Sequence, residues 1–154
     1  MIKAVRHTGI VVRNLDESVK FYRTLGFIED NRDIEEGVFI DTVVGLQGTK
    51  LEWVKLKAPD GYLLELLQYH SHPEQKSTEK QKSNQLGCSR LAFSVKGINA
   101  VCEKIKKIGG SMVNPPALTN DKKVKVAYCH DNEGNLMEIV EVLYNGKELF
   151  ICCL

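Results

Sequence analysis

GCSRLAFSVKGI, residues 87–98, repeats the outline of an earlier segment of the chain, VRHTGIVVRNL, residues 5–15. In both segments apolar residues alternate along a short run that is typical of a half-buried strand, and the run leads into the start of a helix. The strand opens with His7 in the first segment and with Arg90 in the second. A histidine can bind a metal ion, whereas an arginine carries a fixed positive charge and cannot. The chain therefore holds a repeat whose two copies differ in their chemistry.

The repeat continues beyond these two segments. At an offset of 83 residues Gly26 falls on Gly109, and at an offset of 73 residues Glu65 falls on Glu138. The second copy is therefore ten residues shorter than the first, with the deletion in its middle. A repeat of this length means that one structural unit occurs twice, so the fold follows from the unit and its duplication.

Each copy is predicted to form a strand, a helix and three further strands. Apolar residues recur at helical spacing over 15–25, with Asn14 as a candidate N-terminal cap, and again over 98–108. The turns APDG and DNEG precede the last strand of each copy. The strand formers that follow the helices lie in Gly37–Val44, Leu51–Leu56 and YLLELLQY of the first copy, and in VKVAYC and NLMEIVEVL of the second.

The segment between the copies, HSHPEQKSTEKQKSNQLG, is polar and poor in apolar residues, which is typical of a linker. A chain of 154 residues is then expected to consist of two small modules that share a core. The expected boundaries are a first module over 1–70, a polar linker over 71–87, a second module over 88–145 and a C-terminal tail over 146–154.

Charge and composition argue against several classes of partner. The 21 Lys and Arg residues balance 20 Asp and Glu residues, so no overall field attracts nucleic acid or a membrane surface. No apolar run approaches the ~20 residues that cross a bilayer, and the N-terminus lacks the apolar core of a signal peptide, so we expect a cytoplasmic protein. The five cysteines, Cys88, Cys102, Cys129, Cys152 and Cys153, form no CxxC pair, so we expect neither a disulfide framework nor a cysteine zinc site.

Two glutamates stand on strand faces that are otherwise apolar. Side chains alternate along a strand, so Glu65 in YLLELLQY and Glu138 in NLMEIVEVL share their faces with aliphatic side chains. A carboxylate in such surroundings needs a cationic partner or a metal ion. If the first and last strands of each module pair and the modules face one another, both glutamates meet His7 and Arg90 at one place. Imidazole and carboxylates suit a divalent ion such as Zn, Ni, Mn, Co or Fe.

These segments also carry a family resemblance. The HTGIVV and SRLAFSV strands, the FYRTLGF helix end, and PDGYLLELLQ with DNEGNLMEIVE resemble the vicinal oxygen chelate superfamily over about residues 4 to 143. That superfamily includes glyoxalase I, methylmalonyl-CoA epimerase, extradiol dioxygenases, and fosfomycin and bleomycin resistance proteins. The resemblance implies an α+β fold of two tandem βαβββ modules whose curved sheets form an open cradle. It does not identify the substrate.

The motifs resemble most the glyoxalase I and methylmalonyl-CoA epimerase branches, which implies metal ligands at the ends of the first and last strands of both modules. Carried over by position, His7, Glu65 and Glu138 match ligands, and Arg90 stands where a histidine or glutamine is expected. A second histidine at that position would also be needed for dioxygenase iron. Two alternatives follow: a weakened metal site with three protein ligands, or a site in which Arg90 supplants the metal.

If the metal is retained, the resemblance implies a lyase or epimerase that acts on a small carbonyl or thioester substrate through an enediolate, with Glu138 as the base. If the metal is lost, it implies a metal-free binding protein for a small, antibiotic-like molecule, in which Arg90 holds the negative charge of the ligand. In both cases the expected partner is a small molecule, and no other cofactor is expected. A homodimer is expected, because one pair of modules leaves sheet edges and an apolar cradle exposed.

Overall fold

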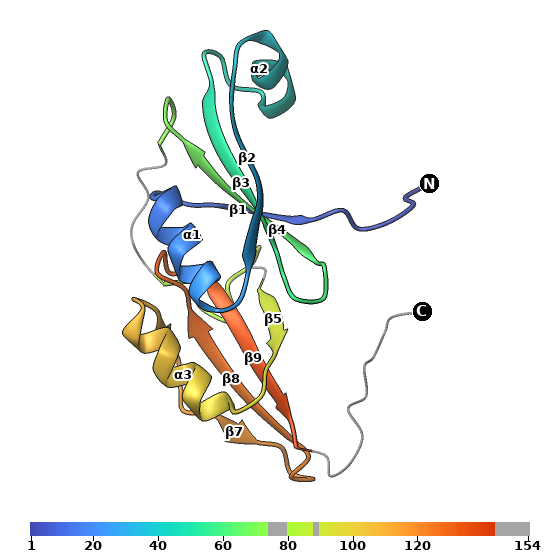
Figure 1. Cartoon of the computed structure of the whole chain (residues 1–154), viewed down its shortest axis with the longest axis vertical. Coiled ribbons are helices and arrows are strands. Elements are labelled where there is room, and N and C mark those ends of the chain that lie inside the picture. Colours follow the sequence, from blue (N-terminus) through green and yellow to red (C-terminus); the bar gives the residue numbers. More distant parts are fainter. Residues whose placement is uncertain (74–79, 88–89, 144–154) are drawn as a thin grey trace. The chain divides into compact units, whose positions relative to one another are not determined.

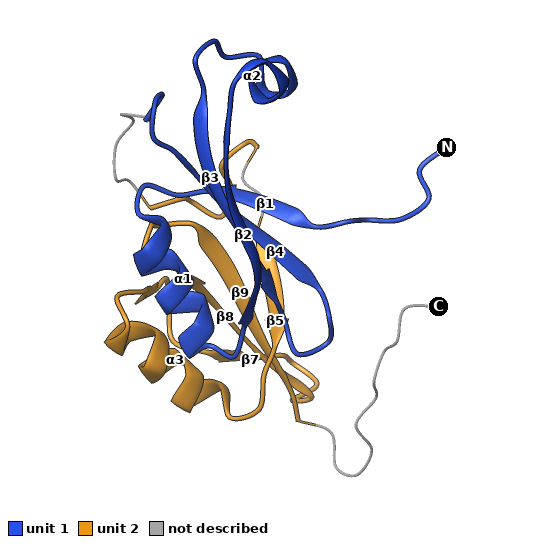
Figure 2. Ribbon diagram, turned by 45° about the horizontal axis from the view of Figure 1, so that its top comes forward, with its two compact units in different colours: residues 1–79 blue, residues 80–154 orange. Residues whose placement is uncertain are grey.

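The computed structural model of the protein describes residues 1–73, 80–87 and 90–143. The chain divides into two compact units, residues 1–79 and 80–154 (Figure 2). The expected tail over 146–154 lies outside the described residues, as do Cys88, Cys152 and Cys153. None of the described helices is long and apolar enough to cross a membrane.

The first unit contains one four-stranded mixed sheet and two helices (Figure 1). Its elements are β1 (Thr8–Val11), α1 (Leu15–Thr24), β2 (Ile28–Glu36), α2 (Val38–Val44), β3 (Lys50–Lys57) and β4 (Leu63–Tyr69). The strand order is β1-β4-β3-β2, with β1 parallel to β4 and the other neighbours antiparallel. The expected pairing of the first strand with the last is confirmed.

Helix α1 covers one face of this sheet. Asn14 caps it as expected, because the side-chain Oδ1 accepts a hydrogen bond from the backbone N–H of Glu17 at 3.1 Å. The helix buries Leu15, Val19, Phe21 and Tyr22, and the sheet beneath it buries Val54, Leu56, Leu64 and Leu66. Each fully buried aliphatic side chain of this kind contributes about 1.5–3 kcal/mol. Since Leu64 and Leu66 lie in this core, Glu65 between them points to the other face of the sheet.

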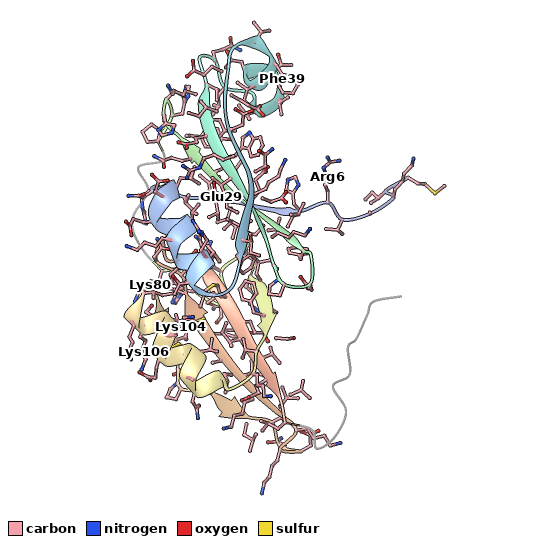
Figure 3. The ribbon with its side chains drawn as sticks, in the orientation of Figure 1. Arg6, Glu29, Phe39, Lys80, Lys104 and Lys106 are labelled. Carbon is pink, nitrogen blue, oxygen red and sulfur yellow. The ribbon has the colours of Figure 1, made fainter. Side chains whose placement is uncertain are left out.

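Residues 37–44 were expected to form a strand, and this prediction is wrong, because Val38–Val44 forms helix α2. Gly37 and Gly45 bracket the helix with positive φ angles of 93° and 74°, which bend the chain at both ends. The Asp41 carboxylate accepts two backbone hydrogen bonds from the following loop, and these bonds hold its pKa below the usual value. The β-branched residues of VFIDTVV favour a strand, but the glycines at both ends and the hydrogen bonds of Asp41 to the following loop stabilise a helix instead. Phe39 projects from this helix and is 72% exposed (Figure 3).

The strand that pairs with β3 comes instead from the preceding segment, the highly charged IEDNRDIEE of β2. Its charges find partners outside the core: Arg32 Nη2 lies 2.6 Å from Asp16 Oδ1, and Lys50 Nζ lies 2.9 Å from Glu36 Oε1. A charged sequence suits this position because β2 is an edge strand, and charges on an edge oppose pairing with another chain.

The second unit repeats this architecture in shorter form. Its elements are β5 (Leu91–Ser94), α3 (Ile98–Lys107), β6 (Ser111–Met112), β7 (Ala117–Leu118), β8 (Val124–His130) and β9 (Leu136–Val142). The strand order is β5-β9-β8-β6, β7 also pairs with β8, and β5 is parallel to β9. Two strands of two residues each thus stand where the first unit has β2. With two mixed sheets and three helices among the described residues, the expected α+β class is confirmed.

Helix α3 packs on its sheet through the predicted apolar stripe. Ile98, Cys102 and Ile105 are buried there, as are Met137 and Ile139 of β9. Because neighbouring residues of a strand point to opposite faces, Glu138 between Met137 and Ile139 points away from this core. The two units therefore present their glutamates in the same way, on the sheet face that the helix does not cover.

Candidate functional site

The first half-site, as we name the group formed by His7, Glu65, Lys55 and Trp53, lies on the face of the first sheet opposite α1. Gly9 of β1 lies beside Glu65 of β4 in the parallel register, and His7 stands two residues earlier on the same face. Its Nε2 lies 3.1 Å from Glu65 Oε2, and the two side chains are 27% and 14% exposed. The imidazole and carboxylate expected from the sequence are thus brought together within this unit.

Strand β3 adds two side chains to this group, Lys55 and Trp53, and of these Lys55 was not predicted from the sequence. Lys55 lies directly opposite Glu65 in the antiparallel register, and its Nζ lies 3.7 Å from Glu65 Oε1. The same ammonium lies over the ring of Trp53, 4.3 Å from the centroid. Trp53 Nε1 in turn donates a hydrogen bond to Glu35 at 3.0 Å. Glu65 therefore has an imidazole at one oxygen and an ammonium near the other.

The second half-site consists of Arg90, Glu138 and Tyr128. Arg90 Nε donates a hydrogen bond to Glu138 Oε2 at 2.8 Å, and the two side chains are 40% and 19% exposed. The guanidinium carbon lies 4.9 Å from the centroid of the Tyr128 ring. Ala92 lies beside Glu138 in the parallel register, as Gly9 lies beside Glu65 in the first unit. The two predicted residues of this unit, Arg90 and Glu138, are thus also brought together.

The two half-sites place their positive charge on different strands. Tyr128 lies opposite Glu138 in the register that Lys55 and Glu65 show in the first unit, so Tyr128 and Lys55 hold equivalent positions. In the first unit the cation comes from β3, and in the second it comes from Arg90, just before β5. Among the residues that the structure describes, each glutamate therefore has one Lys or Arg partner, and an imidazole is found in the first half-site alone.

The donor atoms of the first half-site suit a divalent ion. Two ligand atoms bound to one ion at about 2.0–2.2 Å in adjacent positions lie about 3 Å apart, as His7 Nε2 and Glu65 Oε2 do. His7 Nδ1 is buried and no hydrogen bond fixes it, so the imidazole can take the tautomer that leaves a lone pair on Nε2. The pair therefore fits two positions of a metal site.

Glu138, the third expected ligand, already has a partner. Arg90 cannot coordinate a cation, and its hydrogen bond occupies Glu138 Oε2. Among the residues that the structure describes, no group of three or more His, Cys, Asp or Glu side chains is placed to hold a metal ion. A metal ligand role for Glu138 stays a prediction.

Two other histidines have protein partners outside these half-sites. His70 Nε2 lies 2.9 Å from Glu52 Oε2. His130 is buried, and its Nε2 lies 2.8 Å from the backbone carbonyl oxygen of Gln81. Both contacts tie the ends of strands to neighbouring segments, which is a structural use of the imidazole.

Comparisons with known proteins show what the chain is similar to. The sequence model of the family described as "Glyoxalase/Bleomycin resistance protein/Dioxygenase superfamily" matches residues 4–139. A solved structure of a glyoxalase family protein from Bacillus cereus is 25% identical, with 94% of this chain and 97% of that chain covered and a TM-score of 0.85. No curated protein matches this chain significantly.

More distant solved structures share the fold. A glyoxalase family protein from Enterococcus faecalis is 21% identical, with 90% of this chain and 98% of that chain covered and a TM-score of 0.63. The fosfomycin resistance protein FosX from Listeria monocytogenes, in a complex with Mn(II) and sulfate, is 14% identical, with coverages of 92% and 93% and a TM-score of 0.58. The expected arrangement of strands and helices therefore recurs in these proteins.

Proposed function

The chain belongs to the Glyoxalase/Bleomycin resistance protein/Dioxygenase superfamily, and on this premise we propose that it is a metal-dependent lyase or epimerase. Its substrate is a small carbonyl compound or thioester that reacts through an enediolate. The proposed ligands of the divalent ion (Zn, Ni, Mn, Co or Fe) are His7, Glu65 and Glu138, and Glu138 is also the proposed base. The observation that carries the proposal is the 3.1 Å separation of His7 Nε2 from Glu65 Oε2.

The proposed chemistry is a proton transfer at carbon. When bound, the divalent ion supplies Lewis acidity that stabilises negative charge on the substrate oxygens. Glu138 removes a proton from the carbon next to the carbonyl, and the electron pair of the broken C–H bond moves to the carbonyl oxygen. Return of the proton to the former carbonyl carbon gives the isomer when the proton of the neighbouring hydroxyl group moves to the oxygen of that carbon, so that the hydroxyl carbon becomes the new carbonyl. Return of the proton to the other face of the original carbon gives the epimer. Arg90 orients Glu138 through its 2.8 Å hydrogen bond.

A metal titration tests the proposal. The purified protein is stripped of metal with a chelator and titrated calorimetrically with Zn²⁺, Ni²⁺, Mn²⁺ and Co²⁺. We expect binding near one ion per site with a Kd of low micromolar or less, about 8 kcal/mol. His7→Ala and Glu65→Gln should each weaken it. His70→Ala is the matched control, because it removes an imidazole that also contacts a glutamate, outside the half-sites.

The activity test follows the titration. The metal-loaded protein is assayed with hemithioacetals and with 2-methyl-acyl thioesters, and Glu138→Gln should lower turnover by about 10²-fold or more, the usual contribution of a general base. If none of the four metals binds the parent protein, or if His70→Ala weakens binding as much as His7→Ala does, the metal-dependent enzyme is disproved.

The Arg90–Glu138 pair favours a second candidate function, a metal-free protein that binds a small antibiotic-like molecule. A guanidinium is a fixed cation, so it repels a metal ion and can attract an anionic ligand. This candidate predicts that small anions bind without added metal and that no substrate turns over. We further propose that the protein acts as a cytoplasmic homodimer without nucleic acid or membrane partners.

A further inference from the structure

Lys55 holds Glu65 by charge rather than by a hydrogen bond. Its Nζ lies 3.7 Å from Glu65 Oε1, which is longer than a hydrogen bond. The side chain is 26% exposed, so part of it is open to solvent. An ammonium has three N–H donors and no acceptor. Lys55 can therefore donate to the oxygens of a ligand while it stays beside Glu65.

The position of Lys55 is set by the strand that carries it. The register of β3 against β4 places Lys55 opposite Glu65, and the Trp53 ring lies 4.3 Å below the ammonium. Contact with an aromatic face attracts a cation and limits the conformations of a long lysine side chain. The ammonium is thus held at one place on the sheet face, beside an indole that a small organic ligand can contact.

The charge balance of the first half-site favours an anionic ligand. Glu65 faces Lys55, so its carboxylate is already balanced by a protein cation. A divalent ion at His7 and Glu65 would add two positive charges that no further carboxylate of the first half-site offsets. A substrate that brings negative charge of its own would offset them, and an uncharged substrate would not.

The short separation of His7 from Lys55 limits where the negative charge can lie on the substrate. His7 Nε2 contacts one oxygen of the Glu65 carboxylate, and Lys55 Nζ lies near the other oxygen. A ligand atom beside His7 is therefore only a few bonds away from a ligand atom beside Lys55. The charged group must be attached to, or next to, the carbon that carries the reacting oxygen.

We propose that Lys55 is a specificity-determining residue that selects substrates with a carboxylate next to the reacting carbonyl. The inference rests on the proposed function in that it places the substrate carbonyl at the metal beside His7 and Glu65. It adds the substrate class, a small 2-oxo or 2-hydroxy carboxylate or its equivalent, and it assigns the recognition of the carboxylate to Lys55.

The test compares lactate with its neutral amide, lactamide. Trp53 is the single tryptophan of the chain and lies under the Lys55 ammonium, so its fluorescence reports binding at this place. Titrations are carried out with metal-free protein and with protein saturated with Zn²⁺. In the parent we expect lactate to bind at least about tenfold more tightly than lactamide, because only the lactate carboxylate can accept a charge-assisted hydrogen bond from Lys55, with both partners charged.

Three variants separate recognition from general electrostatics. Lys55→Met should remove most of the preference for lactate, while its Zn²⁺ affinity stays equal or rises because a nearby positive charge is lost. Lys55→Arg should keep part of the preference. Lys57→Met is the matched control, because Lys57 lies two residues further along the same strand, opposite Leu63, and is exposed.

The outcomes distinguish this inference from the proposed function. If Lys55→Met keeps the parent ratio of lactate to lactamide affinity, or if Lys57→Met loses as much, Lys55 does not select the carboxylate. If Zn²⁺ does not bind the parent but metal-free protein shows a Lys55-dependent preference for lactate, the metal-dependent enzyme fails and carboxylate recognition stands. If the parent shows no preference in either state, the inference is wrong even where uncharged substrates turn over.

Discussion

Arg90 donates a hydrogen bond from Nε to Glu138 Oε2 at 2.8 Å, in the place where the other repeat pairs His7 with Glu65. The duplication has kept the carboxylate in both copies and changed its partner. An imidazole can share a metal ion with a carboxylate, whereas a guanidinium can only neutralise and orient it. The two half-sites therefore carry different partners of the glutamate on the same backbone framework.

Replacement of Arg90 by histidine should increase the affinity for divalent metal. The change removes a fixed positive charge beside Glu138 and supplies an imidazole in its place. We expect affinity to rise about ten- to a hundredfold, or about 1.4 to 2.7 kcal/mol, for Arg90→His, and less for Arg90→Ala, which adds no ligand. Calorimetric titration of metal-stripped protein with Ni²⁺ and Zn²⁺ measures the difference.

The control for this prediction is Arg23→His, which makes the same charge change at an exposed position on α1, the helix that covers the other face of the first sheet. Arg23→His should bind metal as the parent does. Should both Arg90 variants bind metal no better than the parent, the guanidinium does not oppose a metal ion. Should metal bind only to the Arg90 variants, the natural protein is a metal-free member of its superfamily.

Gly110 is predicted to tolerate no side chain. A Cβ at this position would lie 2.6 Å from the His130 carbonyl oxygen and 2.6 Å from Ile105 Cγ2. The backbone atom cannot move independently of β8, so Gly110→Ala should lower the free energy of unfolding by about 1–3 kcal/mol. Urea denaturation followed by circular dichroism measures the change in midpoint.

Gly9→Ala provides the comparison for Gly110→Ala. The nearest atom to a Cβ at Gly9 is Leu67 Cδ1 at 3.2 Å, the end of a flexible side chain that can shift. We expect a change of less than about 1 kcal/mol, and the equivalent position of the second unit already carries an alanine, Ala92. Equal losses of stability in the two variants would show that the contact with the β8 backbone is not the cause.

Glu141 is predicted to stabilise α3 in a pH-dependent manner. Its carboxylate accepts hydrogen bonds from the backbone N–H groups of Gly97 and Ile98 at the start of the helix, and these bonds lower the pKa of Glu141 below its usual 4.5. A group whose pKa is lowered by folding stabilises the protein above its unfolded pKa, and this stabilisation is lost as the pH falls through the folded pKa.

Glu141→Gln should therefore cost about 0.5–1 kcal/mol at neutral pH, at the low end for a capping group because Glu141 is only half-buried and solvent screens its charge. The difference from the parent should shrink as the pH falls below 4.5. Thermal unfolding over a series of pH values measures this. A difference that stays constant down to acid pH would contradict the capping role.

A homodimer is predicted from the sheet edges and from exposed apolar side chains. Strand β1 is an edge of the first sheet, and its Val11 is 54% exposed on the face that carries the first half-site. Apolar side chains beside an open strand edge favour association. Sedimentation equilibrium at micromolar concentration should give about twice the chain mass of 17.3 kDa. A mass of one chain under these conditions would refute the dimer.

Much of the fold could be read from local patterns. The helices α1 and α3, the cap at Asn14 and the two turns before the last strands follow from spacing and turn residues over short windows, and they were predicted correctly. The segment 37–44 was misassigned, because glycines with positive φ and a backbone-binding aspartate outweighed its β-branched composition. The charged strand β2 was not predicted, because it forms by pairing with β3, which lies further along the chain.

In the candidate site, too, some residues could be predicted from the sequence and one could not. His7, Glu65, Arg90 and Glu138 were found because a repeat and an alternating pattern are properties of the chain alone. Lys55 was not found, although it shares a strand face with Trp53, because the residue opposite it depends on the register between β3 and β4.

The residue types, the helical spacing of apolar residues and the duplication are properties of the amino-acid sequence, and they do not depend on how the strands pair. The engagement of Glu138 by Arg90, and of Glu65 by both His7 and Lys55, was decided only when strands distant in sequence came into register. A shift of one residue in that register would turn every side chain of a strand to the opposite face, so tertiary pairing determines which charges meet.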